Sequence, residues 1–244
     1  QENAIYSYSD NPLVVETEVG MVNGYSFAIN NSGSSYVALT GGAHTGDKNA
    51  NTNVLKIAGD VRLDGSWQFR ALGDLGSEMA LTLLPGADFS LIGQDEVLQE
   101  SLSVRVAAGA IFTVGEGSSI FGMARVGTHF VDGTWMVACP FEATSLQKFR
   151  GAGTLKLASL STAAEGIEIS ESMTLVPSGW NEAAKVFFRD TPTVKTETAT
   201  TIGAAVALEL EPHATVAFDT TGGDLTLETP IVGDGNVVKK GEGK

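Results

Sequence analysis

The sequence predicts an all-β solenoid, a right-handed parallel β-helix, and three observations favour this fold. A unit of alternating strand, Gly-Ala corner and alternating strand occurs at 81–93 and is repeated at 104–115. The apolar positions of the two copies coincide, and so do their corner glycines, Gly86 and Gly109. The composition, with 29 glycines and 43 % hydrophobic residues, supplies many turns and a continuous core. Because so small a unit cannot bury its own apolar face, it must stack on its neighbours.

A β-sandwich is the alternative fold, since it also contains many short strands separated by turns. The strands of a sandwich need not repeat in register. Here Leu81 and Leu83 fall on Val104 and Val106 at the offset that also joins the two corner glycines. This in-register recurrence favours the solenoid.

Residues 1–53 do not show the repeat clearly, and we expect them to form an atypical N-terminal cap. Segments 13–19 and 36–39 alternate like strands, with Asn-, Ser- and Gly-rich turns between them. A stacked repeat needs a distinct first unit over its open end. The stretch also holds all four tyrosines: Tyr6, Tyr8, Tyr25 and Tyr36. They offer an aromatic binding patch as the competing interpretation.

Residues 54–244 are predicted to form the β-helix repeats as one continuous domain. Corners are expected at Gly59 and Gly65, between short strands. A looser copy of the unit at 130–139 has Gly133, which stands close to one repeat length after Gly109. Further short strands are expected at 149–157, 167–169, 173–176 and 225–227.

Three segments of the C-terminal part need separate interpretation. Residues 181–190 are compatible with a strand or a short helix. The threonine-rich stretch Thr191–Thr201 predicts an extended exposed segment or loop. Residues 208–218 repeat the unit a third time, with His213 in place of the corner glycine, so that this corner is expected to face solvent.

The chain closes with a glycine-rich segment of spaced residues: Gly233, Gly235, Val237, Lys239, Gly241 and Gly243. A partial earlier copy contains Gly151, Gly153, Leu155 and Leu157. This pattern resembles the autotransporter-associated β-strand repeat. The resemblance implies a right-handed parallel β-helix in a secreted or surface-displayed bacterial passenger region. Because the chain stops at Lys244, where that family's next strand starts, a fragment of a longer protein is expected.

The net charge of −14 disfavours binding to nucleic acid or to anionic lipid. No run of apolar residues approaches the length of a membrane helix, so membrane insertion of this segment is not expected. The start at Gln1, without methionine, is consistent with a removed leader. Together with the repeats, this start predicts a secreted or cell-surface location.

Few residues offer chemistry. Cys139 lies among apolar neighbours and is expected to be a buried small hydrophobe. The polar loop 45–53 lacks the glycine and closing glutamate of a calcium loop, so a solvated turn is favoured. His44, His129 and His213 show no metal-ligand spacing; His44 is expected in a polar turn. No metal and no cofactor are predicted.

The carboxylates do not align into a catalytic column at the repeat offset, and we expect them on solvated faces. The pairs and clusters considered are Asp95 and Glu96; Glu165, Glu168 and Glu171; Glu209 and Glu211; and Asp219 and Asp224. The Asp219–Gly222 turn is similar to the Asp-Thr-Gly turn of aspartic proteases, but an extra threonine interrupts it and no second copy exists.

These observations predict a secreted or surface-displayed structural or adhesive module, an adhesin, that binds a host or extracellular glycan or protein. Its candidate contacts are Thr191–Thr201 and the tyrosine-rich N-terminus. The alternative is a carbohydrate-active enzyme, a polysaccharide lyase or a glycoside hydrolase, on the same scaffold. The sequence assigns no catalytic residue, and enzymatic activity is the less favoured interpretation.

Overall fold

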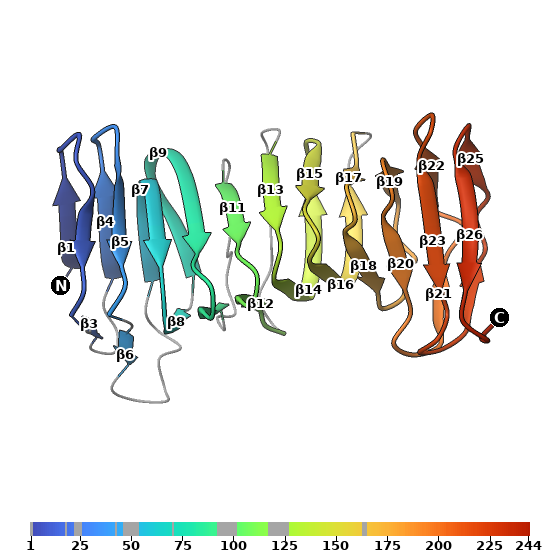
Figure 1. Cartoon of the computed structure of the whole chain (residues 1–244), viewed down its shortest axis with the longest axis horizontal. Helices are drawn as coiled ribbons and strands as arrows, with labels where there is room; N and C mark the ends of the chain where they lie inside the picture. The colour runs from blue at the N-terminus through green and yellow to red at the C-terminus, as the bar shows by residue number, and fades with distance from the viewer. Residues whose placement is uncertain are drawn as a thin grey trace.

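The computed structural model describes residues 2–17, 19–21, 26–41, 43–45, 54–69, 71–91, 102–116, 127–162 and 165–244. Within these ranges the chain forms β-strands and no helix, which confirms the all-β prediction. The strands lie side by side along a rod, with the N-terminus and the C-terminus at opposite ends (Figure 1).

In the part of the chain that the structure describes, two long sheets run along the rod. The first has 13 strands: β1 (Glu2–Ser7), β2 (Leu13–Val15), β4 (Ser26–Asn31), β5 (Tyr36–Leu39), β7 (Val54–Leu63), β9 (Ala71–Leu83), β11 (Leu102–Val106), β13 (Gly127–Val131), β15 (Gln147–Arg150), β17 (Ile167–Ile169), β19 (Ala184–Phe188), β22 (Val206–Leu210) and β25 (Ile231–Gly233). The second has nine: β8 (Ser66–Phe69), β10 (Asp88–Leu91), β12 (Ile111–Val114), β14 (Thr134–Ala143), β16 (Thr154–Thr162), β18 (Thr174–Pro177), β20 (Thr193–Lys195), β23 (Thr215–Asp219) and β26 (Asn236–Lys240). Two small sheets pair β3 (Val19–Met21) with β6 (Ala43–Thr45), and β21 (Thr200–Ile202) with β24 (Leu225–Leu227).

Neighbouring coils pair in parallel, and their register confirms the predicted offset. Leu81 of β9 pairs with Val104 of β11, and Phe89 of β10 pairs with Phe112 of β12. Both pairs have the sequence separation that joins Gly86 to Gly109. A sandwich would pair its strands antiparallel. The fold is therefore the right-handed parallel β-helix and not the alternative.

The predicted corners share one turn. Gly86 and Gly109 have φ of 85° and 78°, and the next residue, Ala87 or Ala110, donates its backbone N–H to the carbonyl three positions earlier. A type II turn requires positive φ at this third position. His213 adopts φ of 70° in the same turn and is exposed, as expected from its place in the third copy.

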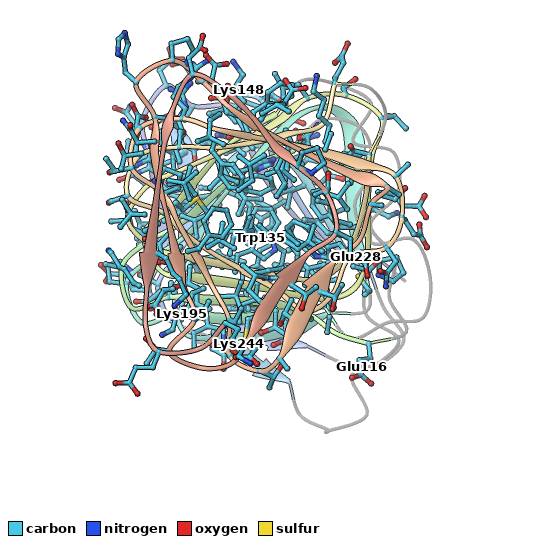
Figure 2. All side chains as sticks on the ribbon, turned by 90° about the vertical axis from the view of Figure 1, so that its right-hand side faces the viewer. Glu116, Trp135, Lys148, Lys195, Glu228 and Lys244 are labelled. Atoms are coloured by element: carbon cyan, nitrogen blue, oxygen red, sulfur yellow. The ribbon has the colours of Figure 1, made fainter. Side chains whose placement is uncertain are left out.

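The inside of the rod is filled by alternate residues of every strand, since successive side chains of a strand point to opposite faces. Apolar side chains crowd the centre around Trp135, and charged ones lie at the rim (Figure 2). Trp67, Phe89, Phe112 and Trp135 fall in register on successive coils. Cys139 is buried among this core, as predicted.

The described part of residues 1–53 already stacks as coils. β1 pairs with β4, β2 with β5 and β3 with β6, all at one sequence offset (2 with 26, 13 with 37 and 19 with 43). β4 and β5 then pair with β7. The change in sequence pattern at Val54 is therefore not a change in backbone architecture, and the separate cap stays a prediction.

The predicted corner at Gly133 is confirmed, since this residue lies between β13 and β14, whereas the predicted corner at Gly59 is wrong. Thr134 pairs with Ile111, so Gly133 falls beside Ala110 and not beside Gly109. A Cβ on Gly133 would clash with the Ala110 carbonyl oxygen, so the absence of a side chain lets the two coils approach closely here. Gly59 (φ 74°) bends the continuous strand β7 where its register with β9 shifts, and therefore forms a bulge instead of separating two strands.

Three further expectations need correction or completion. Residues 181–190 contain the strand β19 and no helix. The stretch Thr191–Thr201 is not a free loop, because it includes β20 and the start of β21 and buries Thr196 and Thr200. His44, expected in a turn, lies in β6, whose backbone pairs with β3.

The two glycine-rich segments have equivalent geometry. Gly151 and Gly233 have φ of 123° and 114°. In each segment the second glycine, Gly153 or Gly235, lies against the previous coil, where a Cβ would clash with a backbone carbonyl oxygen. The first glycine is thus needed for its positive φ and also for space, because a Cβ there would clash with a carbonyl oxygen as well, whereas the second is needed for space.

Candidate functional site: a hollow on the outer face of the first sheet

Four of the six arginines of the chain occupy one line on the outer face of the first sheet. Arg62 pairs with Thr82, Thr82 with Arg105 and Arg105 with Phe130. Phe130 in turn pairs with Arg150. Ser170 and then Arg189 lie on the next two coils, because they come directly after the paired residues of β17 and β19. We call Arg62, Arg105, Arg150 and Arg189 the arginine column; they lie on every second coil.

In the N-terminal part of the column each guanidinium lies over an aromatic ring. The Arg62 guanidinium is 3.6 Å from the centre of the Tyr36 ring, and the Arg105 guanidinium is 4.6 Å from that of Phe130. Arg62 also binds the Asp60 carboxylate at 3.0 Å. Arg105 is exposed and, among the described residues, has no carboxylate partner. Within the described ranges its positive charge therefore has no neutralising partner.

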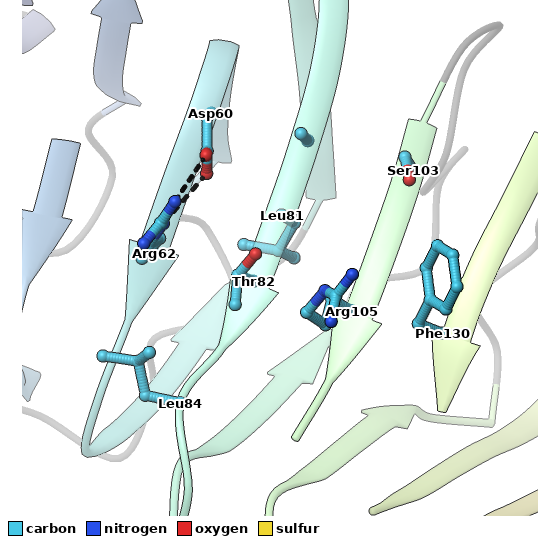
Figure 3. Close-up of a pocket in the computed structure, with 9 residues that line it drawn as sticks. Asp60, Arg62, Leu81, Thr82, Leu84, Ser103, Arg105 and Phe130 are labelled. Atoms are coloured by element: carbon cyan, nitrogen blue, oxygen red, sulfur yellow. Dashed lines mark hydrogen bonds and ion pairs between the residues drawn. The ribbon is translucent and has the colours of Figure 1, made fainter. Parts of the chain in front are cut away.

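A hollow of about 450 Å³ lies between these two arginines. Its floor is β9, where small side chains, Ala80 and Thr82, separate the longer ones on β7 and β11 (Figure 3). The lining residues are Asp60, Arg62, Ala80, Leu81, Thr82, Leu84, Ser103, Arg105 and Phe130. The volume is in the range of small-molecule sites, and the lining combines apolar walls with a few polar groups.

In the C-terminal part of the column both arginines have carboxylate partners. Glu168, whose side chain is only 5 % exposed, lies 3.8 Å from the Arg150 guanidinium and 3.6 Å from that of Arg189. Arg189 also binds Glu211 at 3.1 Å. The hydrogen bond to Glu211, followed by the charge of Glu168, raises the pKa of Arg189. The expectation of a solvated face is therefore wrong for Glu168, which is buried and forms ion pairs with two arginines.

The predicted contact residues fall at different places. Tyr6 and Tyr8 are 55 % and 74 % exposed at the N-terminal end of the rod. Tyr36 lies beneath the Arg62 guanidinium and is not among the residues that line the hollow, whereas Tyr25 lies outside the described residues. In Thr191–Thr201 the Thr196 hydroxyl donates a hydrogen bond to the Gly223 carbonyl at 2.6 Å, so part of this stretch joins one coil to the next.

The histidines and acids that the structure describes show no constellation for catalysis. His129 is fully buried: the Val104 N–H donates to its Nδ1, so Nε2 carries the proton and donates to Gln147 Oε1. Burial lowers the pKa of His129 to about 4, opposed by the bond to Gln147. Hydrogen bonds from the hydroxyl and backbone of Thr221 lower the pKa of Asp219, as in an ordinary turn. Asp95 and Glu96 lie outside the described residues.

Over the part of the chain that the structure describes, no group of three or more His, Cys, Asp or Glu side chains is placed to hold a metal ion. The same residues contain no helix long and apolar enough to cross a membrane.

Comparisons with protein-family models, with curated proteins and with solved structures find no match. Function is therefore inferred from the geometry of the hollow.

Sequence reasoning did not find the hollow. Its charged members Asp60, Arg62 and Arg105 belong to two strands on either side of β9, and no motif joins them. The signal that would identify them is the register, because it places Thr82 between the two arginines.

Proposed function

We propose that the protein is a secreted or surface-displayed β-helical module that binds an extracellular glycan or protein through the hollow on the first sheet. The observation that supports this proposal is the arrangement of Arg62 and Arg105 on either side of the small residues of β9. A smooth structural rod does not need such a gap, because larger outward side chains would fit there without disturbing the core.

Two aromatic rings support the same interpretation. Tyr36 and Phe130 hold the guanidinium groups of Arg62 and Arg105 in place, so the walls of the hollow are ordered before a ligand arrives. A site that is formed in advance loses less conformational entropy on binding. Secretion and display at a cell surface are part of the proposal and rest on the glycine-rich repeat pattern.

Binding without turnover is the favoured activity. Glycoside hydrolysis ordinarily uses two carboxyl groups that flank the scissile bond. Among the residues that line the hollow, Asp60 is the single carboxylate, and it is already paired with Arg62. A hydrolase would therefore need groups from outside this lining.

The proposal is tested by filling the hollow. Thr82→Trp places an indole on its floor without altering the inward residues of β9. Ser90→Trp is the matched control, since Ser90 is a half-buried outward residue of the next strand, on the other sheet. We expect a panel of extracellular glycans and proteins to contain a ligand that binds the wild type and Ser90→Trp but not Thr82→Trp. Equal binding by all three would refute the proposal, and release of a cleaved product would replace binding by enzymatic activity.

A further inference from the structure

We infer that the ligand of the hollow is a saccharide unit that carries one anionic group, and that Arg105 binds this group. The inference rests on the proposed function and specifies its ligand. It depends on the one arginine of the column whose charge is left available.

Arg105 differs from its three counterparts in its partner. Arg62 is paired with Asp60, and Arg150 and Arg189 share Glu168. Arg105 is held by the Phe130 ring alone among the described residues. An aromatic ring orients a guanidinium but does not neutralise it. The planar fork of donors therefore stays available to a carboxylate or sulfate, which it binds in bidentate geometry.

The other polar groups of the hollow suit a ligand with hydroxyls. Within the described part of the chain the Thr82 hydroxyl has no hydrogen-bond partner. The Ser103 hydroxyl donates to the Thr128 carbonyl at 2.8 Å, which leaves its oxygen free to accept. Asp60 can accept from a sugar hydroxyl beside its bond to Arg62. These groups offer donors and acceptors around one cation, as an acidic sugar requires.

The charge of the molecule limits how acidic the ligand can be. With −14 overall, and with Asp60 in the lining, the protein repels a densely charged polyanion or an acidic peptide. One anionic group among several hydroxyls meets Arg105 without accumulating this repulsion. The coils of Arg62 and Arg105 are two strand spacings apart, about 9.6 Å, so the ligand lies across β9 between them.

The inference is tested with a hyaluronan oligosaccharide, whose glucuronate carboxylates alternate with neutral sugars, against its carboxyl-reduced form. A keratan sulfate fragment of equal length carries sulfate without carboxylate and identifies which anion is bound. A glutamate peptide represents the acidic peptide. Affinities are measured by calorimetry for the wild type, Thr82→Trp, Arg105→Gln, Arg105→Lys and Lys156→Gln.

We expect at least one of the two acidic saccharides to bind, and the carboxyl-reduced form not to bind. Arg105→Gln should lower the affinity roughly tenfold to a hundredfold, the usual effect of losing a hydrogen-bonded charge. Arg105→Lys should be intermediate, because it keeps the charge but loses the fork. Lys156→Gln removes the same charge from the second sheet and should change little. Higher salt should weaken binding.

Three outcomes would contradict the inference. If the neutral and acidic sugars bind equally and Thr82→Trp abolishes both, the ligand is not anionic, while the hollow remains a binding site. If the glutamate peptide binds more tightly than the saccharides, the ligand class is wrong. If Thr82→Trp changes no ligand's binding, the inference and the proposed function both fail. Circular dichroism of each variant separates loss of binding from loss of folding.

Discussion

The two halves of the rod share one backbone architecture and differ in the partners of their outward arginines. From β7 to β13 the arginines of the outer face stack on Tyr36 and Phe130. From β15 to β22 the arginines of the same line are bound by Glu168 and Glu211. Among the described residues, the first half therefore leaves one arginine, Arg105, without a carboxylate partner, whereas both arginines of the second half are neutralised.

The interior changes at the same place. Trp67, Phe89 and Phe112 lead to Trp135 in register, and the next coils continue with Leu155, Leu175 and Val194. His129 lies at this boundary, at 5.2 Å from Trp135 and 4.9 Å from Phe149 between ring centres. Register alone therefore does not make a binding site. The partner that each outward charge receives decides whether it can bind a ligand.

The largest expected effect concerns the boundary residue His129. Its folded pKa of about 4 lies below the unfolded value of 6.5, so the unfolded state binds the proton more tightly. Stability from this residue is complete above pH 6.5 and is lost as the pH falls towards about 4. The loss is about 3 kcal/mol at 1.36 kcal/mol per pH unit. Urea unfolding across this range should show the slope in the wild type and a shallower one in His129→Gln. Equal slopes would contradict the assignment.

Glu168→Gln should destabilise the half of the rod in which the arginines are neutralised. It leaves Arg150 and Arg189 without the carboxylate between them, and removing one member of a buried ion pair costs about 3–5 kcal/mol. Since both guanidinium groups are partly exposed, we expect about 2 kcal/mol of the unfolding free energy to be lost. Glu209→Gln disrupts a more exposed pair with Lys185 and should cost below about 0.5 kcal/mol. Chemical denaturation measures both; equal losses would mean that Glu168 is not special.

The two tryptophans at the ends of the aromatic stack should differ. Trp67 Nε1–H donates to the Asp64 carbonyl at 2.6 Å, whereas Trp135 Nε1 is buried without a partner among the described residues. Trp67→Phe therefore loses a hydrogen bond and Trp135→Phe removes an unsatisfied donor. We expect Trp67→Phe to be the more destabilising by about 1–2 kcal/mol, measured by thermal and urea unfolding. The reverse order would show that side-chain volume dominates at both sites.

The aromatic ring under Arg105 should contribute less to stability than His129, Glu168 or Trp67. Phe130→Leu should cost about 0.5–1 kcal/mol of stability, and it should also weaken binding of the acidic saccharide, because the guanidinium is no longer oriented. Phe187→Leu is the matched control, since the Lys185 ammonium lies 4.5 Å from that ring in the other half. It should cost similar stability without affecting binding. If Phe130→Leu leaves the affinity unchanged, the Phe130 ring does not contribute to ligand binding.

The stacking of β9 on β11 and of β10 on β12 could be predicted from the sequence, because the two adjacent copies of the repeated unit have the same length. Gly86 and Gly109 therefore appear at one offset, and the register comes with them. The third copy could be recognised from its turn, which keeps Ala214 after His213. The register of Gly133 could not be predicted, because the turn before β14 is shorter than the turn before β12.

The arginine column could not be predicted in this way. Its successive positions, 62, 82, 105, 130 and 150, are unequally spaced along the chain. Unequal coil lengths destroy any fixed period in the sequence, while backbone hydrogen bonds restore alignment in space. The predicted solvated face for Glu168 is wrong for a related reason, since its arginine partners lie on other coils.

The short offset between paired strands has a consequence for how the chain folds. Paired strands come from consecutive coils, which in a chain of 244 residues gives a relative contact order of about 0.1. This value is closer to that of helical bundles than to that of β-sandwiches, in which distant strands must meet first. We therefore expect folding to nucleate locally and to spread from coil to coil. The aromatic residues from Trp67 to Trp135 are the segment that we expect to fold first.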